Sequence, residues 1–539
     1  MVREDSIPPA DVPAKTSGPM THRQILVVMF GLMLGMFLAA LDQSIVGTAM
    51  PKIVSQFNGL DHMSWTVTAY LLTSTAAVPL YGKISDQIGR RPVYLFAIVI
   101  FLVGSALAGM SQNMGQLIGF RAVQGLGGGG LMSLSLAIIG DVIPPRDRGR
   151  YQGLFGAVFA VSSVAGPLLG GFFTDHLSWR WIFYINLPVG VVALFVAAAV
   201  LKIDQRKQKH TIDWAGAALL VGGVTALLLV TSWSGTANGW TSATTLLLGV
   251  GGVLALVLFA LVERRAAEPI MPPHLFRDHT FSLTSGIGFV VGLAMFGAII
   301  YLPIYLQVVR GDSPTGSGLR MIPMMIGLLA ASIISGRVIS KTGTYKMWPL
   351  LGTSVTIVGL VLLSRLRLDT SMWLLGLFMV LMGIGLGCVM QVLVLAVQNS
   401  VEMKDMGAAT AGSMFFRSIG GAFGTAIFGT VLTSRLNHHI SEGVAAAGLK
   451  GQGGGGFAAG GEEKLTSGGR AAIEQLPVQL QDIVLNGFVK ALDDLFLVGI
   501  PFVLVALVLA FFIREVPLRG HGGGQDQDKA EQAPIPVME

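Results

Sequence analysis

Three charged residues, Asp42, Arg121 and Arg417, stand inside long apolar stretches of the sequence. An ionised side chain at mid-membrane costs about 3 kcal/mol on insertion scales, so it generally faces a cavity or a partner. Asp42 is therefore a candidate proton and substrate site; the alternative is an acid that caps a helix end or faces outer water. Gln124 lies one helical turn from Arg121 and can share its hydrogen bonds. For Arg417, structural pairing and contact with a substrate or lipid both stay open.

A second group of charged residues lies in the turn GKISDQIGRRP, between two apolar runs. Two glycines bracket an acid and precede a basic pair, so helix ends can approach closely while opposite charges hold them together. This composition predicts a latch that holds the outward-open state and breaks on inward opening. The alternative is that the turn only keeps positive charge on the cytoplasmic side of the membrane. That alternative explains the arginines but neither the acid nor the two glycines. The residues concerned are Gly82, Asp86, Gly89, Arg90 and Arg91.

The sequence GPLLGG combines a bend with close packing. Pro167, after Gly166, removes a backbone donor and bends a helix, while Gly170 and Gly171 let a neighbouring helix approach. Ordinary glycine-rich membrane packing is the alternative, since the chain has 71 glycines. We expect a conformational role for these four residues.

These residues must be positioned by membrane-spanning helices. Hydrophobic residues make up 52% of the 539 and charged residues only 12%, whereas soluble domains carry roughly 25% charged residues. A crossing needs about 20 apolar residues. Fourteen segments qualify: 25–50, 64–84, 93–111, 114–140, 151–173, 181–201, 214–231, 244–262, 281–306, 317–339, 347–364, 372–397, 407–434 and 494–513.

The distribution of Lys and Arg predicts the orientation of these segments. With the amino terminus inside, inner segments hold 23 of the 36 basic residues and short outer loops hold six. This bias matches the positive-inside rule and places both termini in the cytoplasm. The net charge of +6 therefore reflects topology, and no nucleic-acid partner is expected.

An internal repeat divides the chain. The stretch 119–130 aligns with 377–388, including three glycines in each copy. Transporters use such repeats to expose a central site to either membrane face in turn. We expect a cytoplasmic tail (1–24), a six-helix bundle (25–201), two linker helices with their loops (202–280), a second six-helix bundle (281–513) that includes a long extracytoplasmic segment (435–493), and a disordered cytoplasmic tail (514–539).

Several of these motifs together resemble the fourteen-helix drug:proton antiporter family of the major facilitator superfamily. They are LDQSIVGTAMP (41–51), GKISDQIGRRP (82–92), RAVQGLGGGG (121–130), GPLLGG (166–171) and WRWIFYINLPVG (179–190). The family usually has Asn where Gly47 stands, and its outer segment before the last helix is usually shorter. The resemblance implies an all-α integral membrane protein with the major facilitator fold: two six-helix bundles plus two additional transmembrane helices.

The resemblance also implies a function. It predicts a proton-coupled antiporter in a bacterial cytoplasmic membrane, which exports amphipathic drugs or toxic compounds, cationic ones among them. Asp42 and Arg121 would carry proton coupling, with Arg121 transferring a proton or keeping a nearby acid ionised. A structural ion pair is the alternative for Arg121, and Gln124 would contact substrate or support the structure.

Two other functions stay open: a dedicated exporter of a native lipid or secondary metabolite, and a transport-dead receptor or scaffold. The expected partners are substrate, protons and membrane lipids. The segment 435–493 could dock an extracytoplasmic partner or be a tolerated insertion.

The sequence contains no GxxxxGK[ST] phosphate loop and no HExxH pair, and its single cysteine, Cys388, lies in an apolar run. We therefore expect no enzyme activity, no cofactor and no metal site, and an ion gradient as the energy source.

Overall fold

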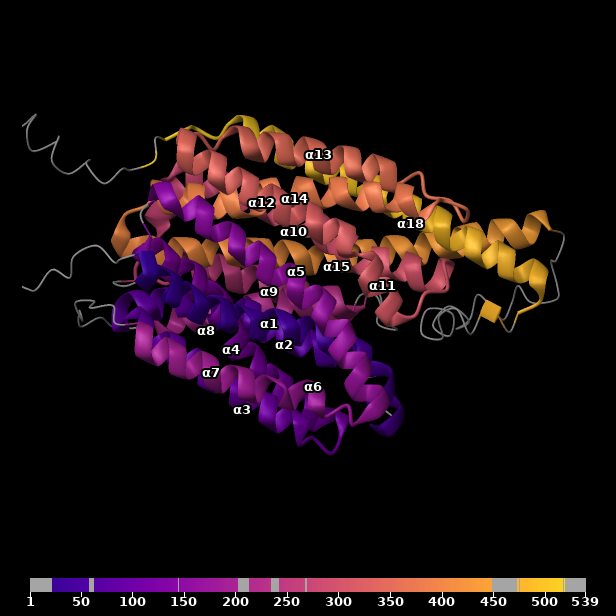
Figure 1. Cartoon of the computed structure of the whole chain (residues 1–539), viewed down its shortest axis with the longest axis horizontal. Coiled ribbons are helices and arrows are strands. Elements are labelled where there is room, and N and C mark those ends of the chain that lie inside the picture. The colour runs from indigo at the N-terminus through magenta and orange to yellow at the C-terminus, as the bar shows by residue number, and fades with distance from the viewer. Residues whose placement is uncertain are drawn as a thin grey trace, which may run out of the picture.

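The computed structural model of the chain describes residues 22–57, 63–143, 145–201, 213–233, 242–266, 269–447, 473–474, 476–516 and 518. Long helices run side by side along the longest axis of the molecule (Figure 1). This described part of the chain contains helices and no strand, so the predicted all-α fold is confirmed. Most of the two expected tails, before residue 22 and after residue 518, lies outside the described residues.

The helices fall into three groups along the chain. The first is α1 (His22–Phe57), α2 (Met63–Ile88), α3 (Arg90–Gly109), α4 (Met114–Val142), α5 (Pro145–His176), α6 (Trp181–Tyr184) and α7 (Asn186–Val200). The second is α8 (Trp214–Trp233) and α9 (Ala243–Glu263). The third is η2 (Pro273–Arg277), α10 (His279–Ile304), η3 (Tyr305–Val309), α11 (Pro314–Arg320), α12 (Ile322–Thr342), α13 (Met347–Leu363), α14 (Met372–Ser400), η4 (Met403–Asp405), α15 (Met406–Ala446) and α18 (Val478–Phe511).

Each of the fourteen predicted segments falls on helix in this structure. Among the described residues, ten helical stretches are long and apolar enough to cross a membrane. Three shorter apolar stretches lie in α8, α10 and α13. A multi-pass membrane protein is therefore confirmed, whereas fourteen crossings stays a prediction.

Glycines on two sides of α4 bring α2 and α3 close to it. A Cβ on Gly125 would lie 2.4 Å from the backbone of α2, and one on Gly127 would lie 2.4 Å from the backbone of α3. Helix α14 repeats the arrangement: a Cβ on Gly383 would lie 2.0 Å from the backbone of α12, and one on Gly385 would lie 2.7 Å from that of α13. The glycines that align in the sequence repeat thus occupy equivalent packing positions.

Helices α15 and α18 continue together beyond the predicted spans, at the right-hand end of Figure 1. Helix α18 begins 16 residues before the expected start of the last span at residue 494. The two extensions are stable as helices because their apolar side chains pack in one cluster, which includes Leu436, Ile440, Val484, Leu485 and Phe488. The predicted outer segment 435–493 is therefore helical at both ends, while its residues 448–472 lie outside the described part.

Candidate functional site

Asp42 and Arg121 meet in the interior of the first group of helices, between α1 and α4. Their exposed fractions are 0% and 1%. Nη1 of Arg121 donates to Oδ2 of Asp42 in an ion pair. Two buried amides donate to the other carboxylate oxygen, Nε2 of Gln124 at 2.8 Å and Nδ2 of Asn186 at 3.3 Å. Asp42 therefore has no contact with outer water in this structure, and its charge is balanced by a single cation.

A second layer of polar contacts fixes these groups. Nδ2 of Asn186 also donates to Oγ of Ser105 at 3.0 Å, and Ser105 in turn donates to the carbonyl of Phe183 at 2.9 Å. Helix α3 can approach α4 here because a Cβ on Gly104 would lie 2.5 Å from the backbone of Gln124. We did not predict Asn186 or Ser105 as site residues. The amide between apolar neighbours in INLPVG is the signal that could have identified Asn186.

Arg121 also connects α4 to α2. Its guanidinium lies 4.3 Å from the ring centroid of Tyr70, and its Nε donates to the carbonyl of Thr66 at 3.4 Å. Oγ1 of Thr66 and Oδ1 of Asn186 are buried without a hydrogen-bond partner among the described residues. Buried polar atoms normally have partners, so these two oxygens are available to a water or to a polar group of a ligand when the helices move.

The residues of the predicted latch gather around Arg90, which is 2% exposed. The turn before it requires glycine, because Gly89 has a φ of 108°. Nη1 of Arg90 lies 2.5 Å from Oδ1 of Asp86, and Nε lies 2.6 Å from Oδ2 of Asp141 on α4. Oγ of Ser85 accepts a further bond from Arg90 at 2.5 Å. Asp141 was not predicted, and it provides a second carboxylate for the same guanidinium.

This latch joins the first group of helices to α15. The backbone N–H of Ala408 donates to Oδ2 of Asp86 at 3.0 Å. A Cβ on Gly407 would lie 2.3 Å from Nη1 of Arg90, and one on Gly82 would lie 2.8 Å from the carbonyl of Gly407. Burial raises the pKa of Asp86, which lies beyond the predicted span, to about 6, and Arg90 opposes that shift. The contact partners on α15 were not predicted from the sequence.

The second arginine of the turn does not join this cluster. Arg91 is exposed and donates to the carbonyl of Ala198 on α7 at 2.6 Å. A separate contact between the halves forms at Arg148, whose Nη1 donates to the carbonyl of Gln398 at 3.2 Å. Nε2 of Gln398 donates to the carbonyl of Leu136 at 2.9 Å. Two independent polar contacts thus hold α2, α4 and α5 against α14 and α15.

The GPLLGG sequence lies in α5, where it contacts α1 and the second half of the chain. A Cβ on Gly166 would lie 2.0 Å from a serine hydroxyl of α1, and one on Gly170 would lie 2.9 Å from the backbone of α1. A Cβ on Gly318 of α11 would lie 3.2 Å from Pro167. Gly171 is half-buried on the same helix. The motif therefore packs against α1 on one side and against α11 on the other.

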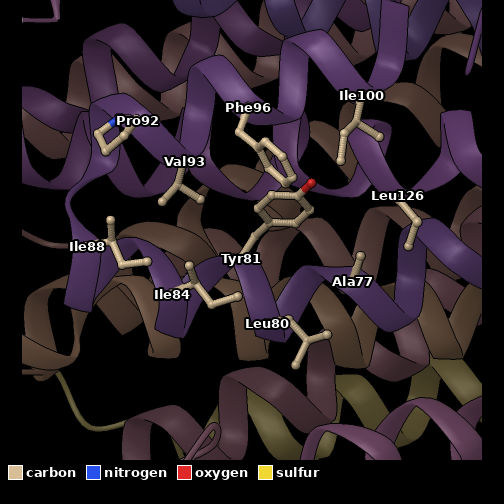
Figure 2. Close-up of a pocket in the computed structure, with 10 residues that line it drawn as sticks. All are labelled: Ala77, Leu80, Tyr81, Ile84, Ile88, Pro92, Val93, Phe96, Ile100 and Leu126. Carbon is tan, nitrogen blue, oxygen red and sulfur yellow. The ribbon is translucent and has the colours of Figure 1, made fainter. Parts of the chain in front are cut away.

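Two cavities lie apart from the Asp42 network. Arg417 borders a small one between α10, α14 and α15. A larger one, of about 410 Å³, is lined by α2, α3 and α4 and includes Tyr81 and Phe96 (Figure 2). Its lining is apolar and Phe96 is exposed, so it opens on the surface of the bundle and offers no charged group to a substrate.

Comparison with known proteins shows where this arrangement occurs. The family model described as Major Facilitator Superfamily matches residues 32–425. The multidrug transporter protein MdtP of Bacillus subtilis is 38% identical over 534 residues, which cover 96% of this chain and 97% of MdtP. Multidrug resistance protein 3 of the same organism is 36% identical over 491 residues, 90% of this chain and 94% of that protein.

The fold also matches a solved transporter structure. The proton:xylose symporter XylE superposes with a TM-score of 0.58 at 12% identity, over 92% of this chain and 97% of XylE. With the family model and the relatives in Bacillus, this likeness identifies a transporter and not an enzyme. The chain therefore belongs to the major facilitator superfamily, within the part of it whose members are named for multidrug efflux.

Proposed function

We propose that the chain is a proton-coupled antiporter that exports amphipathic small molecules across a bacterial cytoplasmic membrane. The observation that carries this proposal is the buried carboxylate of Asp42, held by Arg121 on a different helix. The names of the Bacillus relatives support drugs as the substrate class. The distribution of Lys and Arg supports cytoplasmic termini and an extracytoplasmic segment 435–493.

The geometry suggests how a proton would act. A proton on Asp42 cancels its negative charge, whereas Arg121 stays charged. The attraction between α1 and α4 then falls sharply, because an ion pair in a medium of low dielectric is stronger than one in water. Protonation would loosen α1 from α4, and release of the proton would restore the contact. Gln124 and Asn186, which donate to Oδ1, would orient the carboxylate for both steps.

The two glycine motifs would convert this change into gating. The cluster of Arg90 with Asp86 and Asp141 would keep the cytoplasmic ends of α2 and α15 together, with Gly82 and Gly89 permitting the close approach. The bend predicted at Pro167 would let α5 pivot against α1 and α11. The residues of that bend are Gly166, Pro167, Gly170 and Gly171.

Asp42→Asn tests the proton role in proteoliposomes with an acidic interior. Wild-type protein should accumulate an amphipathic dye in exchange for protons, and a protonophore should abolish the accumulation. Asn cannot exchange the proton, so the variant should lose accumulation while it still exchanges dye for dye at equal pH. Asp494→Asn is the matched control, because it removes a partly exposed acid that lies outside the Asp42 network. Normal accumulation by Asp42→Asn would show that another group couples the proton.

A further inference from the structure

Arg417 is half-buried between α10, α14 and α15, and no residue that the structure describes neutralises its charge. It belongs to α15, and its side chain borders a cavity of about 10 Å³ between α10, α14 and α15. A cavity of roughly this size holds about one water-sized group, such as one carboxylate oxygen. Gly288 and Met390 line the same cavity. The guanidinium therefore has access to a space large enough for a single polar group.

Three buried arginines show what the half-buried Arg417 lacks. Arg90 binds two carboxylates, Arg121 binds Asp42, and Arg148 donates to three backbone carbonyls. Across the residues that the structure describes, Arg417 has neither an ion pair nor a hydrogen bond. A charge that is partly removed from water without a counter-charge is unfavourable. We expect such a charge to be stabilised in another state of the protein or in a complex with a ligand.

A hydroxyl group lies beside the guanidinium. Ser413, one turn before Arg417 on α15, lines the same cavity. A hydroxyl donor beside a guanidinium suits an anion that accepts several hydrogen bonds.

The backbone explains why this space is open. A Cβ on Gly292 would lie 2.3 Å from the carbonyl of Arg417, so α10 and α15 touch backbone to backbone there. One turn earlier, Gly288 has no side chain to fill the volume beside the guanidinium. Any larger residue at Gly288 would occupy the cavity.

We propose that Arg417 is an anion-binding residue of the substrate path, and that transported compounds carry a carboxylate or similar anionic group that binds it. The proposal rests on the transport function proposed above and deepens it. In the first half of the chain, the buried carboxylate of Asp42 is already paired with Arg121 and is therefore not free to bind a cationic substrate. The favoured substrates are therefore amphipathic acids or zwitterions.

A matched pair of probes tests the proposal by binding alone. The acid 11-(dansylamino)undecanoic acid and its primary amide differ only in charge, and their fluorescence reports binding to the full-length protein in nanodiscs. Wild-type protein should prefer the acid. Arg417→Met should weaken binding of the acid at least about tenfold, the scale of a lost charge-assisted hydrogen bond, and should leave binding of the amide within about twofold. Arg417→Lys should retain part of the preference.

Two controls separate this role from others. Arg435→Gln removes a positive charge from the same helix outside the cavity, and it should leave both affinities unchanged. Without ligand, Arg417→Met should melt at or above the wild-type temperature, since it removes a half-buried charge that has no counter-charge among the described residues. A structural arginine would lower the melting temperature.

Equal binding of acid and amide by wild-type protein, or a persistent acid preference in Arg417→Met and Arg417→Gln, would overturn the proposal. The assay needs no pH gradient, so a failure of proton coupling would leave its result unaffected. The wild-type comparison also decides the matter if no variant folds.

Discussion

Gly407 is the position where a single methyl group should open the cytoplasmic latch. An alanine Cβ there would lie 2.3 Å from Nη1 of Arg90 and 2.4 Å from Oδ1 of Asp86. Neither side chain can move aside freely, because Asp141 and the N–H of Ala408 hold them from other directions. Gly407→Ala should therefore push α15 away from α2.

The size of the effect follows from overpacking in a closed interface. Such substitutions cost about 1–3 kcal/mol, which corresponds to a shift of roughly 5-fold to 150-fold in the ratio of open to closed protein. The cost applies to the closed latch alone, because an open latch leaves space for the methyl group. Gly407→Ala should thus favour the open cytoplasmic side without a comparable loss of overall stability.

Spin labels on either side of the latch measure this shift. Ile88 and Met403 are both exposed and lie next to the latch on opposite halves, and the natural Cys388 is buried and should not label. Double electron–electron resonance between cysteines at 88 and 403 should show a longer distance gaining population in Gly407→Ala. Gly222→Ala is the matched control, since nothing lies within 4 Å of the added methyl. An unchanged distance distribution in Gly407→Ala would refute the latch.

Two further predictions concern the latch and the glycine packing. Burial raises the pKa of Asp86 to about 6 in the closed latch, whereas an exposed Asp titrates near 3.9. The closed form therefore binds a proton at Asp86 more tightly than the open form does. Lowering the pH from 7 to 5 should favour the closed form and shorten the distance between residues 88 and 403. Asp86→Asn should remove that pH dependence, and its persistence would point to another group. Gly383→Ala and Gly129→Ala place a methyl 2.0 Å and 2.2 Å from a backbone carbonyl oxygen, so each should lower the free energy of unfolding by about 3 kcal/mol and thereby lower the melting temperature. Gly119→Ala, with nothing within 4 Å of the added methyl, should leave the melting temperature unchanged.

Much of the fold could be predicted because the hydropathy of a segment shows whether it lies in lipid or in water. Apolar stretches of about 20 residues identify helices in lipid whatever their neighbours are. Helix ends beyond the lipid follow a different rule. The extensions of α15 and α18 depend on apolar contacts between Ile440 and residues such as Val484 and Phe488, which are distant in sequence. A span prediction therefore places the helices and misses the length of these two.

The candidate site was predicted in part for a similar reason. Asp42 and Arg121 each stand out as charges in apolar surroundings, yet nothing in a single sequence pairs residues that lie 79 positions apart. Asp141 and Gly407 were missed because an acid or a glycine near a helix end is common, and their importance depends on which helices meet. Arg417 illustrates the converse, since its lack of an ion pair among the described residues becomes evident only from the packed helices.

Helix α15 contains 41 residues and is continuous from the latch to the outer extension. At 1.5 Å per residue it is about 60 Å long, twice the hydrocarbon thickness, so a tilt of about 10° around its cytoplasmic end would sweep the outer end through about 10 Å. A small rotation of α15 around its cytoplasmic end therefore produces a larger displacement at its outer end. With the orientation proposed above, an antibody fragment that holds α15 against α18 near His439 and Asp494, which lie 3.0 Å apart, would slow the cytoplasmic gate from outside the cell without entering the substrate path.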